Sequence, residues 1–177
     1  DTSDAIIALD MDSGKIAWQF QATAGDVWNA ACLNGGANCP QDPGGDFDFG
    51  ASVIIADRPD GSQVLLAGQK SGEVFALDPD ANGAVLWRNR ISMGTTNGGI
   101  HWGMALSGQR LVVPVADPER ERDGYIPKPG LYALDLASGD GVCLYGRGDY
   151  RNTRADRGRE DALVQHREDH PQQGVMN

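Results

Sequence analysis

The sequence predicts an all-β fold in which one four-stranded unit is repeated and stacked. Three observations support this prediction: a motif occurs three times, apolar runs are short and bounded by turn residues, and glycine makes up 24 of the 177 residues. High glycine content with short apolar runs is typical of many turns, and hence of strands rather than helices. The chain is long enough to bury a substantial core.

The repeated motif is centred on Ala-Leu-Asp. Residues 5–18 read AIIALDMDSGKIAW, residues 73–87 read EVFALDPDANGAVLW, and residues 130–142 read GLYALDLASGDGV. In each copy an apolar strand leads into an Asp whose carboxylate can accept backbone N–H bonds across a turn. A glycine then supplies the positive φ that the return strand needs, and in two copies a Trp follows that can pack on a neighbouring unit. The repeat residues are Asp10, Gly14, Trp18, Asp78, Gly83, Trp87, Asp135 and Gly139.

Further strands are expected between the motifs, at residues 51–56, 63–68 and 109–115, because these runs are short, rich in β-branched residues and bounded by Gly, Pro or Asp. About four strands per interval describes a blade of a β-propeller. A blade cannot bury both of its faces alone, so we expect the units to stack on one another. The third copy departs from the pattern, because Cys143 stands where the spacing predicts a Trp.

Charge and hydropathy exclude two classes of partner. The 25 acidic residues outnumber the 15 basic ones, which gives a formal net charge of −10. A nucleic-acid-binding protein shows the opposite sign, so no nucleic-acid partner is expected. No apolar run approaches the roughly 18 residues that a membrane-spanning helix needs, so no membrane span is expected.

Cys32 and Cys39 bracket the short loop CLNGGANC, which could close as a small disulfide ring. Such a bond would indicate an oxidising compartment such as a periplasm. The alternative is two free thiols in a loop. No CxxC or CxxCH pattern occurs, which excludes a zinc knuckle and a c-type haem site.

Three segments together resemble a known family. ALDMDSGKIAW resembles the tryptophan-docking motif of the PQQ-dependent (quinoprotein) alcohol dehydrogenases. DVWNAACLNGGANCPQDPGGDFDFGAS resembles the disulfide-bearing loop of the polyvinyl-alcohol-dehydrogenase-like branch, and GGIHWGMA resembles a later motif of the same branch. The resemblance runs from about residue 4 to residue 141. It implies about two and a half blades of an eight-bladed propeller, with PQQ and Ca²⁺ as cofactors. It also implies an alcohol substrate such as a secondary alcohol or polyol, cytochrome c or another electron acceptor, and a periplasmic or secreted location.

Asp48 is the candidate catalytic base. It lies between Phe47 and Phe49, where a partly apolar wall is expected to raise the pKa of its carboxyl toward working pH, and the resemblance assigns the matching Asp as the base. The alternative is that Asp46 and Asp48 only shape a turn. Lys70 matches the position at which the family places a cation that contacts the quinone oxygens; its alternative is a solvated turn residue.

His101 and Trp102 are the candidate residues of the cofactor wall. The preceding Gly98 and Gly99 allow close approach of backbone to a ligand, and the indole of Trp102 can stack on a planar group. The alternative for Trp102 is packing between blades. The resemblance places the Ca²⁺ ligands upstream of this segment, so no metal ligand is assigned here.

We expect two regions: a partial propeller over residues 1–145 and an irregular, disordered tail over residues 146–177. The tail is rich in Arg and acids and has few apolar residues, which favours disorder. A frameshift near residues 140–143 is one hypothesis for the tail, and an authentic solvated tail is the other.

A partial ring should leave open edges that favour self-association and should be inactive alone. The competing functions are a non-catalytic PQQ-like propeller, acting as a binding or scaffold module of the outer-membrane assembly type, and an inactive gene remnant.

Overall fold

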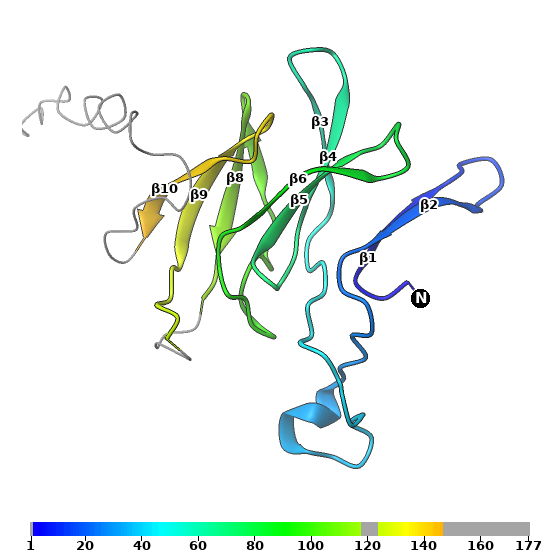
Figure 1. Cartoon of the computed structure of the whole chain (residues 1–177), viewed down its shortest axis with the longest axis vertical. Helices are drawn as coiled ribbons and strands as arrows, with labels where there is room; N and C mark the ends of the chain where they lie inside the picture. The colour runs from blue at the N-terminus through cyan, green and yellow to red at the C-terminus, as the bar shows by residue number, and fades with distance from the viewer. Residues whose placement is uncertain (1, 118–123, 147–177) are drawn as a thin grey trace, which may run out of the picture.

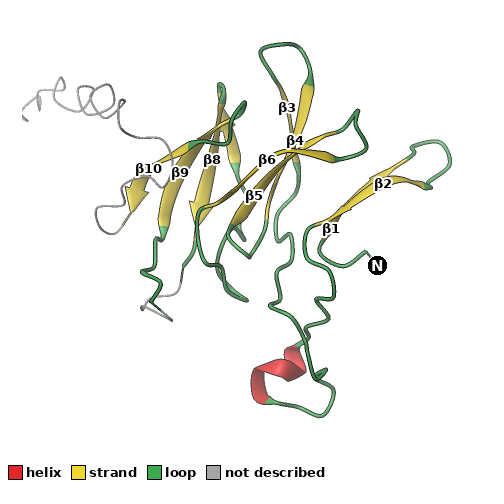
Figure 2. Cartoon of the chain, viewed as in Figure 1, coloured by secondary structure: helices red, strands yellow, loops and turns green. Residues whose placement is uncertain are grey.

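The computed structural model describes residues 2–117 and 124–146, and this part of the chain is all-β (Figure 1). The expected tail therefore lies almost wholly outside the described residues. The only helix in the described part is the short 3₁₀ helix η1 (Ala30–Asn34), in the long loop before β3 (Figure 2). The strands are β1 (Ala5–Leu9), β2 (Ile16–Gln21), β3 (Ile54–Asp57), β4 (Gln63–Gly68), β5 (Glu73–Asp78), β6 (Ala84–Arg90), β7 (Ala105–Ser107), β8 (Arg110–Val115), β9 (Gly130–Asp135) and β10 (Gly141–Gly146).

The strands form two complete four-stranded antiparallel sheets and one hairpin. Their orders are β3-β4-β5-β6 and β10-β9-β8-β7, with β1-β2 as the hairpin. Each sheet is thus a meander of consecutive strands, as a propeller blade is. This arrangement confirms the predicted two and a half blades. The expected strands at 63–68 and 109–115 correspond to β4 and β8, β3 is shorter than the run at 51–56, and β7 was not expected.

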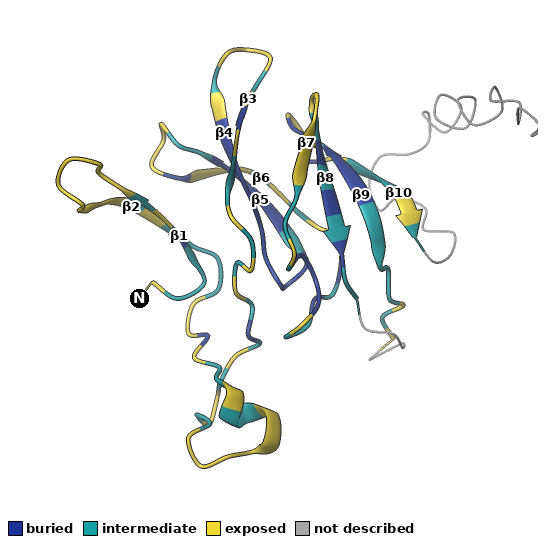
Figure 3. Ribbon diagram, turned by 180° about the vertical axis from the view of Figure 1, so that it is seen from behind, coloured by how far each residue is buried: buried dark blue, intermediate teal, exposed yellow. Residues whose placement is uncertain are grey.

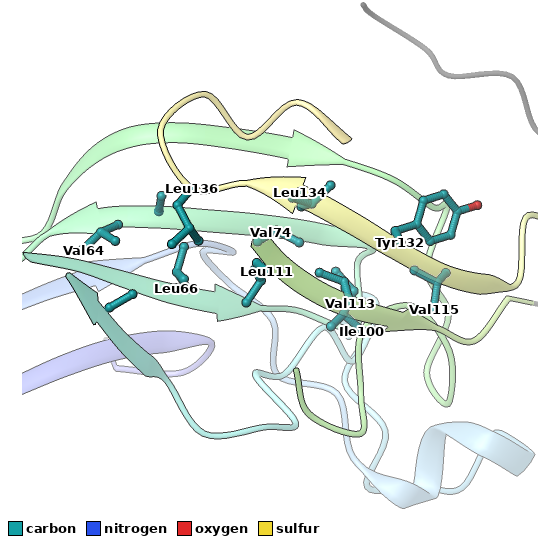
Figure 4. Close-up of a cluster of buried hydrophobic side chains, with 12 residues drawn as sticks. Val64, Leu66, Val74, Ile100, Leu111, Val113, Val115, Tyr132, Leu134 and Leu136 are labelled. Carbon is teal, nitrogen blue, oxygen red and sulfur yellow. The ribbon is translucent and has the colours of Figure 1, made fainter. Parts of the chain in front are cut away.

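The middle sheet is buried on both faces because its central strands alternate apolar side chains between two cores. Val64, Leu66, Val74 and Ala76 face the third sheet and pack with residues such as Leu111, Val113 and Leu134 (Figure 4). Leu65, Ala67, Phe75 and Leu77 face the β1-β2 hairpin and pack with Ile6, Trp18 and Phe20. Figure 3 shows β4 and β5 as the most buried part of the fold. The expectation that the units stack is therefore confirmed.

The three repeat turns have the expected hydrogen bonds. The carboxylate of each repeat Asp accepts a backbone N–H from its turn, at 2.7 Å for Asp10, 2.9 Å for Asp78 and 3.0 Å for Asp135. The turn glycines Gly14, Gly83 and Gly139 have φ of 68°, 75° and 73°. Each hairpin thus closes through a side-chain cap and a left-handed glycine, as the sequence predicted.

The repeat tryptophans connect neighbouring sheets. Trp18 lies over Gly83, where a Cβ atom would be 2.7 Å from its ring, and Trp87 lies over Gly139, where a Cβ atom would be 2.5 Å from Cε3. The indole Nε1–H of Trp87 also donates to the carbonyl oxygen of Leu136 at 2.9 Å. A glycine is needed at these two turns because the indole of the preceding unit occupies the space of a side chain.

The third hairpin has a different register. Ala8 pairs with Trp18 and Ala76 with Trp87, but Ala133 pairs with Val142. In the first two hairpins a register shift lies just before the Trp, whereas in the third it lies after Cys143. The sequence spacing placed Cys143 at the Trp position; the ladder instead places Cys143 opposite Tyr132.

Cys32 and Cys39 form a disulfide with a Cα–Cα distance of 4.8 Å. The bond closes the loop that carries η1, which projects away from the sheets (Figure 1). The alternative of two free thiols is therefore not what the structure shows. Within the described ranges, no helix is long and apolar enough to cross a membrane.

Candidate functional site at one end of the blades

The candidate residues lie on connections at one end of the sheets. Asp4 precedes β1, Asp26 follows β2, Asp48 precedes β3, and Lys70 lies in the turn from β4 to β5. His101 precedes β7. In an antiparallel meander, odd strands begin and even strands end at the same edge. The topology therefore gathers residues that are far apart in the sequence.

An ion triad forms the centre of the site. The Nζ atom of Lys70 lies 2.7 Å from Oδ2 of Asp48 and 3.1 Å from Oδ2 of Asp46. The side chains of Lys70 and Asp46 are 9% and 11% exposed, whereas that of Asp48 is 57% exposed. Asp46 therefore forms a buried pair with the lysine, while Asp48 presents its carboxylate to solvent or to a ligand.

The backbone around Lys70 is held closely from two sides. The Lys70 N–H donates to the carbonyl oxygen of Asp48 at 3.1 Å, and the turn closes with a Gly72 N–H to Gln69 carbonyl bond of 2.9 Å. Gly99, with φ of 63°, lies so close that a Cβ atom there would collide with the carbonyl oxygen of Lys70. The paired-glycine segment thus does allow a close backbone approach, and its nearest neighbour in this structure is the lysine turn.

Asp26 positions the segment that carries Asp46 and Asp48. Its Oδ2 accepts the Phe47 N–H at 2.9 Å and its Oδ1 accepts the Trp28 N–H at 3.2 Å. On the other side of Asp48, the ring of Phe49 packs against Phe75 with centroids 5.9 Å apart. The two neighbours of Asp48 are therefore fixed, one by a buried carboxylate and the other by the core.

The pKa shifts separate the two carboxyls of the triad. The hydrogen bond from Lys70 lowers the pKa of Asp48 below its ordinary value, while burial raises the pKa of Asp46 despite the lysine. Burial alone would lower the pKa of Lys70, but its bonds to Asp48 and Asp46 raise it. The sequence-based expectation of a raised pKa for Asp48 is therefore wrong, because an ammonium group at 2.7 Å outweighs the apolar neighbours.

Asp4 was not a sequence candidate, yet it belongs to this cluster. It is half-buried, with a left-handed backbone (φ 46°), and its Oδ2 atom is shielded from solvent without a hydrogen-bond partner. Burial, followed by the charges of Asp26 and Asp48, raises the pKa of Asp4 to about 6. Asp46 also has positive φ, at 59°. Left-handed non-glycine residues are uncommon and concentrate at functional sites.

His101 and Trp102 lie beside this cluster. A Cβ atom at Gly50, two residues after Asp48, would be 2.9 Å from the His101 carbonyl oxygen. The rings of His101 and Trp102 are 4.5 Å apart, and Nδ1 of His101 is buried without a partner. The Trp102 side chain belongs to neither described core and the residue is 77% exposed, which argues against the alternative of packing between the described blades.

The side chains present suit a planar ligand that carries carbonyl oxygens. Two of the three N–H groups of the Lys70 ammonium bind Asp46 and Asp48, which leaves one without a partner among the described residues. The carboxylate of Asp48 and the indole of Trp102 are accessible nearby. Across residues 2–117 and 124–146, no group of three His, Cys, Asp or Glu side chains is arranged to hold a metal ion.

Comparison with known proteins gives two sequence relatives of the same kind. The chain is 39% identical over 143 residues to the polyvinylalcohol dehydrogenase of a Pseudomonas species, which covers 81% of this chain and 22% of the relative. It is also 39% identical over 143 residues to the polyvinylalcohol dehydrogenase of a Sphingopyxis species, which covers 79% of this chain and 22% of the relative. The chain thus spans about a fifth of the length of these relatives. No protein-family model matches it.

Among solved structures, a europium-containing methanol dehydrogenase matches with a TM-score of 0.52 and 17% identity, covering 81% of this chain and 22% of that chain. This likeness supports the propeller fold. The two sequence matches confirm the resemblance to the polyvinyl-alcohol-dehydrogenase-like branch.

Proposed function

We propose, from the relationship of this chain to the polyvinyl alcohol dehydrogenases, that it supplies the base and one quinone-binding cation of a PQQ-dependent alcohol dehydrogenase site. The proposed substrates are secondary alcohols or polyols such as polyvinyl alcohol, which are oxidised to carbonyl compounds. The observation that carries the proposal is the contact of an exposed Asp48 carboxylate with a buried Lys70 ammonium at 2.7 Å.

Asp48 would accept the proton of the alcohol hydroxyl. Its carboxylate is the exposed member of the triad, and its lowered pKa keeps it ionised and ready to accept a proton at neutral pH. Asp26, through Phe47, and the packing of Phe49 fix its position. Such positioning matters because a general base must lie within hydrogen-bonding reach of the proton that it removes.

Lys70 and Trp102 would bind the cofactor. The ammonium of Lys70 is held by two carboxylates and can direct its remaining N–H to a quinone oxygen, while the indole of Trp102 can stack on the ring system. Bound PQQ would supply the acceptor for the hydride equivalent of the alcohol, and Lys70 and Trp102 would hold it. The family resemblance implies Ca²⁺ as a second cofactor, and cytochrome c or another carrier as the electron acceptor.

We further propose a periplasmic or secreted location. The Cys32–Cys39 disulfide supports it, because disulfides persist mainly in oxidising compartments.

Binding tests the cofactor part of the proposal. The chain is titrated with PQQ, with and without Ca²⁺, and binding is followed by quenching of tryptophan emission. Lys70→Met should weaken binding at least about tenfold, since it removes a charge-assisted hydrogen bond. Lys15→Met, which removes an equal charge from an exposed turn, is the control and should bind like wild type. Equal binding by the two variants would remove Lys70 from the cofactor site.

Activity tests the base. In a chimera, the 143 matched residues of this chain replace the corresponding segment of the Pseudomonas polyvinylalcohol dehydrogenase, and secondary-alcohol oxidation is followed with a redox dye. Asp48→Asn should lower kcat by about 10² or more, while Asp80→Asn, on an exposed distant turn, should not. Full activity of the Asp48→Asn chimera would refute Asp48 as the base. A chimera that binds no PQQ would favour the scaffold function.

A further inference from the structure

The three repeat hairpins differ in the burial of equivalent residues. The residues on either side of the alanine in Ala-Leu-Asp point toward the preceding unit. In the second and third units these residues belong to the two cores and are at most 7% exposed: Phe75, Leu77, Tyr132 and Leu134. Their counterparts in the first unit, Ile7 and Leu9, are 38% and 57% exposed and belong to neither described core.

The turn of the first hairpin shows the same difference. Leu136, which follows the repeat Asp of the third unit, is 1% exposed, whereas Met11, at the same place in the first unit, is 96% exposed. In the other two units an indole from the preceding unit lies over the turn glycine, but no described atom lies within 4 Å of the Cβ position of Gly14. The first hairpin therefore presents an unpartnered accepting face, formed by Ile7, Leu9, Met11 and the turn at Gly14.

The opposite end of the stack presents the matching surface. In the middle sheet Ala76 pairs with Leu66 and Trp87, and these three side chains dock on the third sheet. The same ladder positions of the third sheet hold apolar side chains that belong to neither described core, those of Val112, Ala133 and Val142. These three residues define a donating face, which is equivalent to the surface that each earlier unit uses to dock on the next.

We propose that the donating face of one chain docks on the accepting face of a second copy, so that copies stack head to tail as the units within each chain do. The internal contacts are the template for this docking, because two successive units already meet through equivalent surfaces. The two faces are different surfaces, so the contact is heterologous, and a pair of copies still has one free face of each kind. Association therefore continues beyond a dimer.

The contact between copies differs from the internal contacts in one respect. Val142 stands at the ladder position that Trp18 and Trp87 hold in the other hairpins, since all three pair with the alanine of the repeat. No indole is thus available from the donating face to cover the turn at Gly14. The copies should associate more weakly than the units within a chain, and an indole at position 142 should strengthen the association.

Sedimentation velocity over a range of chain concentrations gives the first test. The weight-average mass of the wild type should rise from 18.9 kDa past that of a dimer. Leu9→Asp should weaken association at least about tenfold, because docking would bury an unpaired charge. Leu33→Asp, at a residue that is 65% exposed on the disulfide-bonded loop, is the matched control and should associate like wild type. Circular dichroism shows whether both variants keep the β-sheet.

A variant that gains association gives the second test. Val142→Trp should strengthen association about tenfold, since an aromatic contact forms over the turn of the next copy. Gly14→Asn should remove this gain, because its side chain occupies the space of the indole. Asn tolerates the left-handed backbone at this position, where φ is 68°. In the wild-type background, in which no indole docks there, Gly14→Asn should leave association unchanged.

Several results would overturn the proposal. A wild-type chain that stays monomeric at every concentration would assign the accepting face to a different partner, and association that stops at a dimer would exclude head-to-tail stacking. Equal association of Leu9→Asp and wild type would assign the contact to pairing of strand edges. Absence of a gain in Val142→Trp, or a gain that survives Gly14→Asn, would show that the copies do not meet as the internal units do. None of these results bears on the roles proposed for Asp48 and Lys70.

Discussion

The contact between Trp87 and Gly139 gives a sharp prediction, because the chain contains its own control. Gly139→Ala would place a methyl group 2.5 Å from Cε3 of Trp87, at a backbone φ of 73°. Gly14 occupies the equivalent turn of the first hairpin with φ of 68°, and no described atom lies within 4 Å of its Cβ position. Gly14→Ala therefore has the same backbone cost without the collision.

The magnitude follows from two separable costs. A left-handed alanine costs about 1 kcal/mol at either turn. Overpacking at a close contact costs about 1–3 kcal/mol more, because the indole must move and its 2.9 Å hydrogen bond to the Leu136 carbonyl would lengthen. We therefore expect the free energy of unfolding to fall by about 2–4 kcal/mol in Gly139→Ala and by about 1 kcal/mol in Gly14→Ala.

Urea unfolding followed by tryptophan fluorescence measures both values. Trp87→Phe in the Gly139→Ala background should recover part of the loss, since a smaller ring leaves room for the methyl group, and the coupling should exceed about 0.5 kcal/mol. Equal destabilisation by Gly139→Ala and Gly14→Ala would show that the docking contact does not exist in solution.

Three further predictions concern the site and the loop. Lys70→Met should lower the free energy of unfolding by about 3–5 kcal/mol at pH 7, because Asp46 loses its buried partner. This destabilisation should become smaller as the pH falls and Asp46 is protonated. Thermal melts at pH 7 and pH 5 measure the difference. Reduction of the Cys32–Cys39 bond should lower the free energy of unfolding by about 2 kcal/mol on a chain-entropy estimate, and urea curves with and without reductant test this. Since the pKa of Asp4 is raised in the folded state, the folded chain holds a proton that the unfolded chain releases between pH 3.8 and about 6. Wild type should therefore lose about 1–2 kcal/mol relative to Asp4→Asn over that window, after allowance for partial exposure, with no further change at higher pH; identical pH–stability curves would contradict this.

The fold could be predicted because its signals lie in short local motifs and because the motif is repeated. Each Ala-Leu-Asp motif specifies a strand, a capped turn and a glycine within about fifteen residues, and the stacking follows from the apolar residues on both faces of β4 and β5. The register of the third hairpin could not be predicted. It depends on where a β-bulge falls, and the spacing from Gly139 to Cys143 does not reveal that position.

The site could be predicted only in part, for a related reason. Asp48 and Lys70 could be selected because each lies next to a recognisable segment, but their 2.7 Å contact brings together residues from two connections. The direction of the pKa shift of Asp48 depends on that contact, so reasoning from its two phenylalanine neighbours gave the wrong sign. Asp4 has no motif of its own, and its importance comes from the burial of one oxygen atom against residues that lie more than twenty positions away.

The burial of the middle sheet on both faces has a consequence for how the chain opens. Amide hydrogens of β4 and β5 are shielded by a core on either side, whereas β1, β2 and β10 each belong to sheets with one described packed face. In stacked repeats, stability is approximately a sum of nearest-neighbour contacts, so outer units can open while inner ones stay closed. Hydrogen exchange should therefore form a gradient, slowest along β4 and β5. The turn that carries Lys70 joins those two strands, so the lysine end of the site lies on the last part of the chain to open, and the Asp4 end lies on a part that opens early.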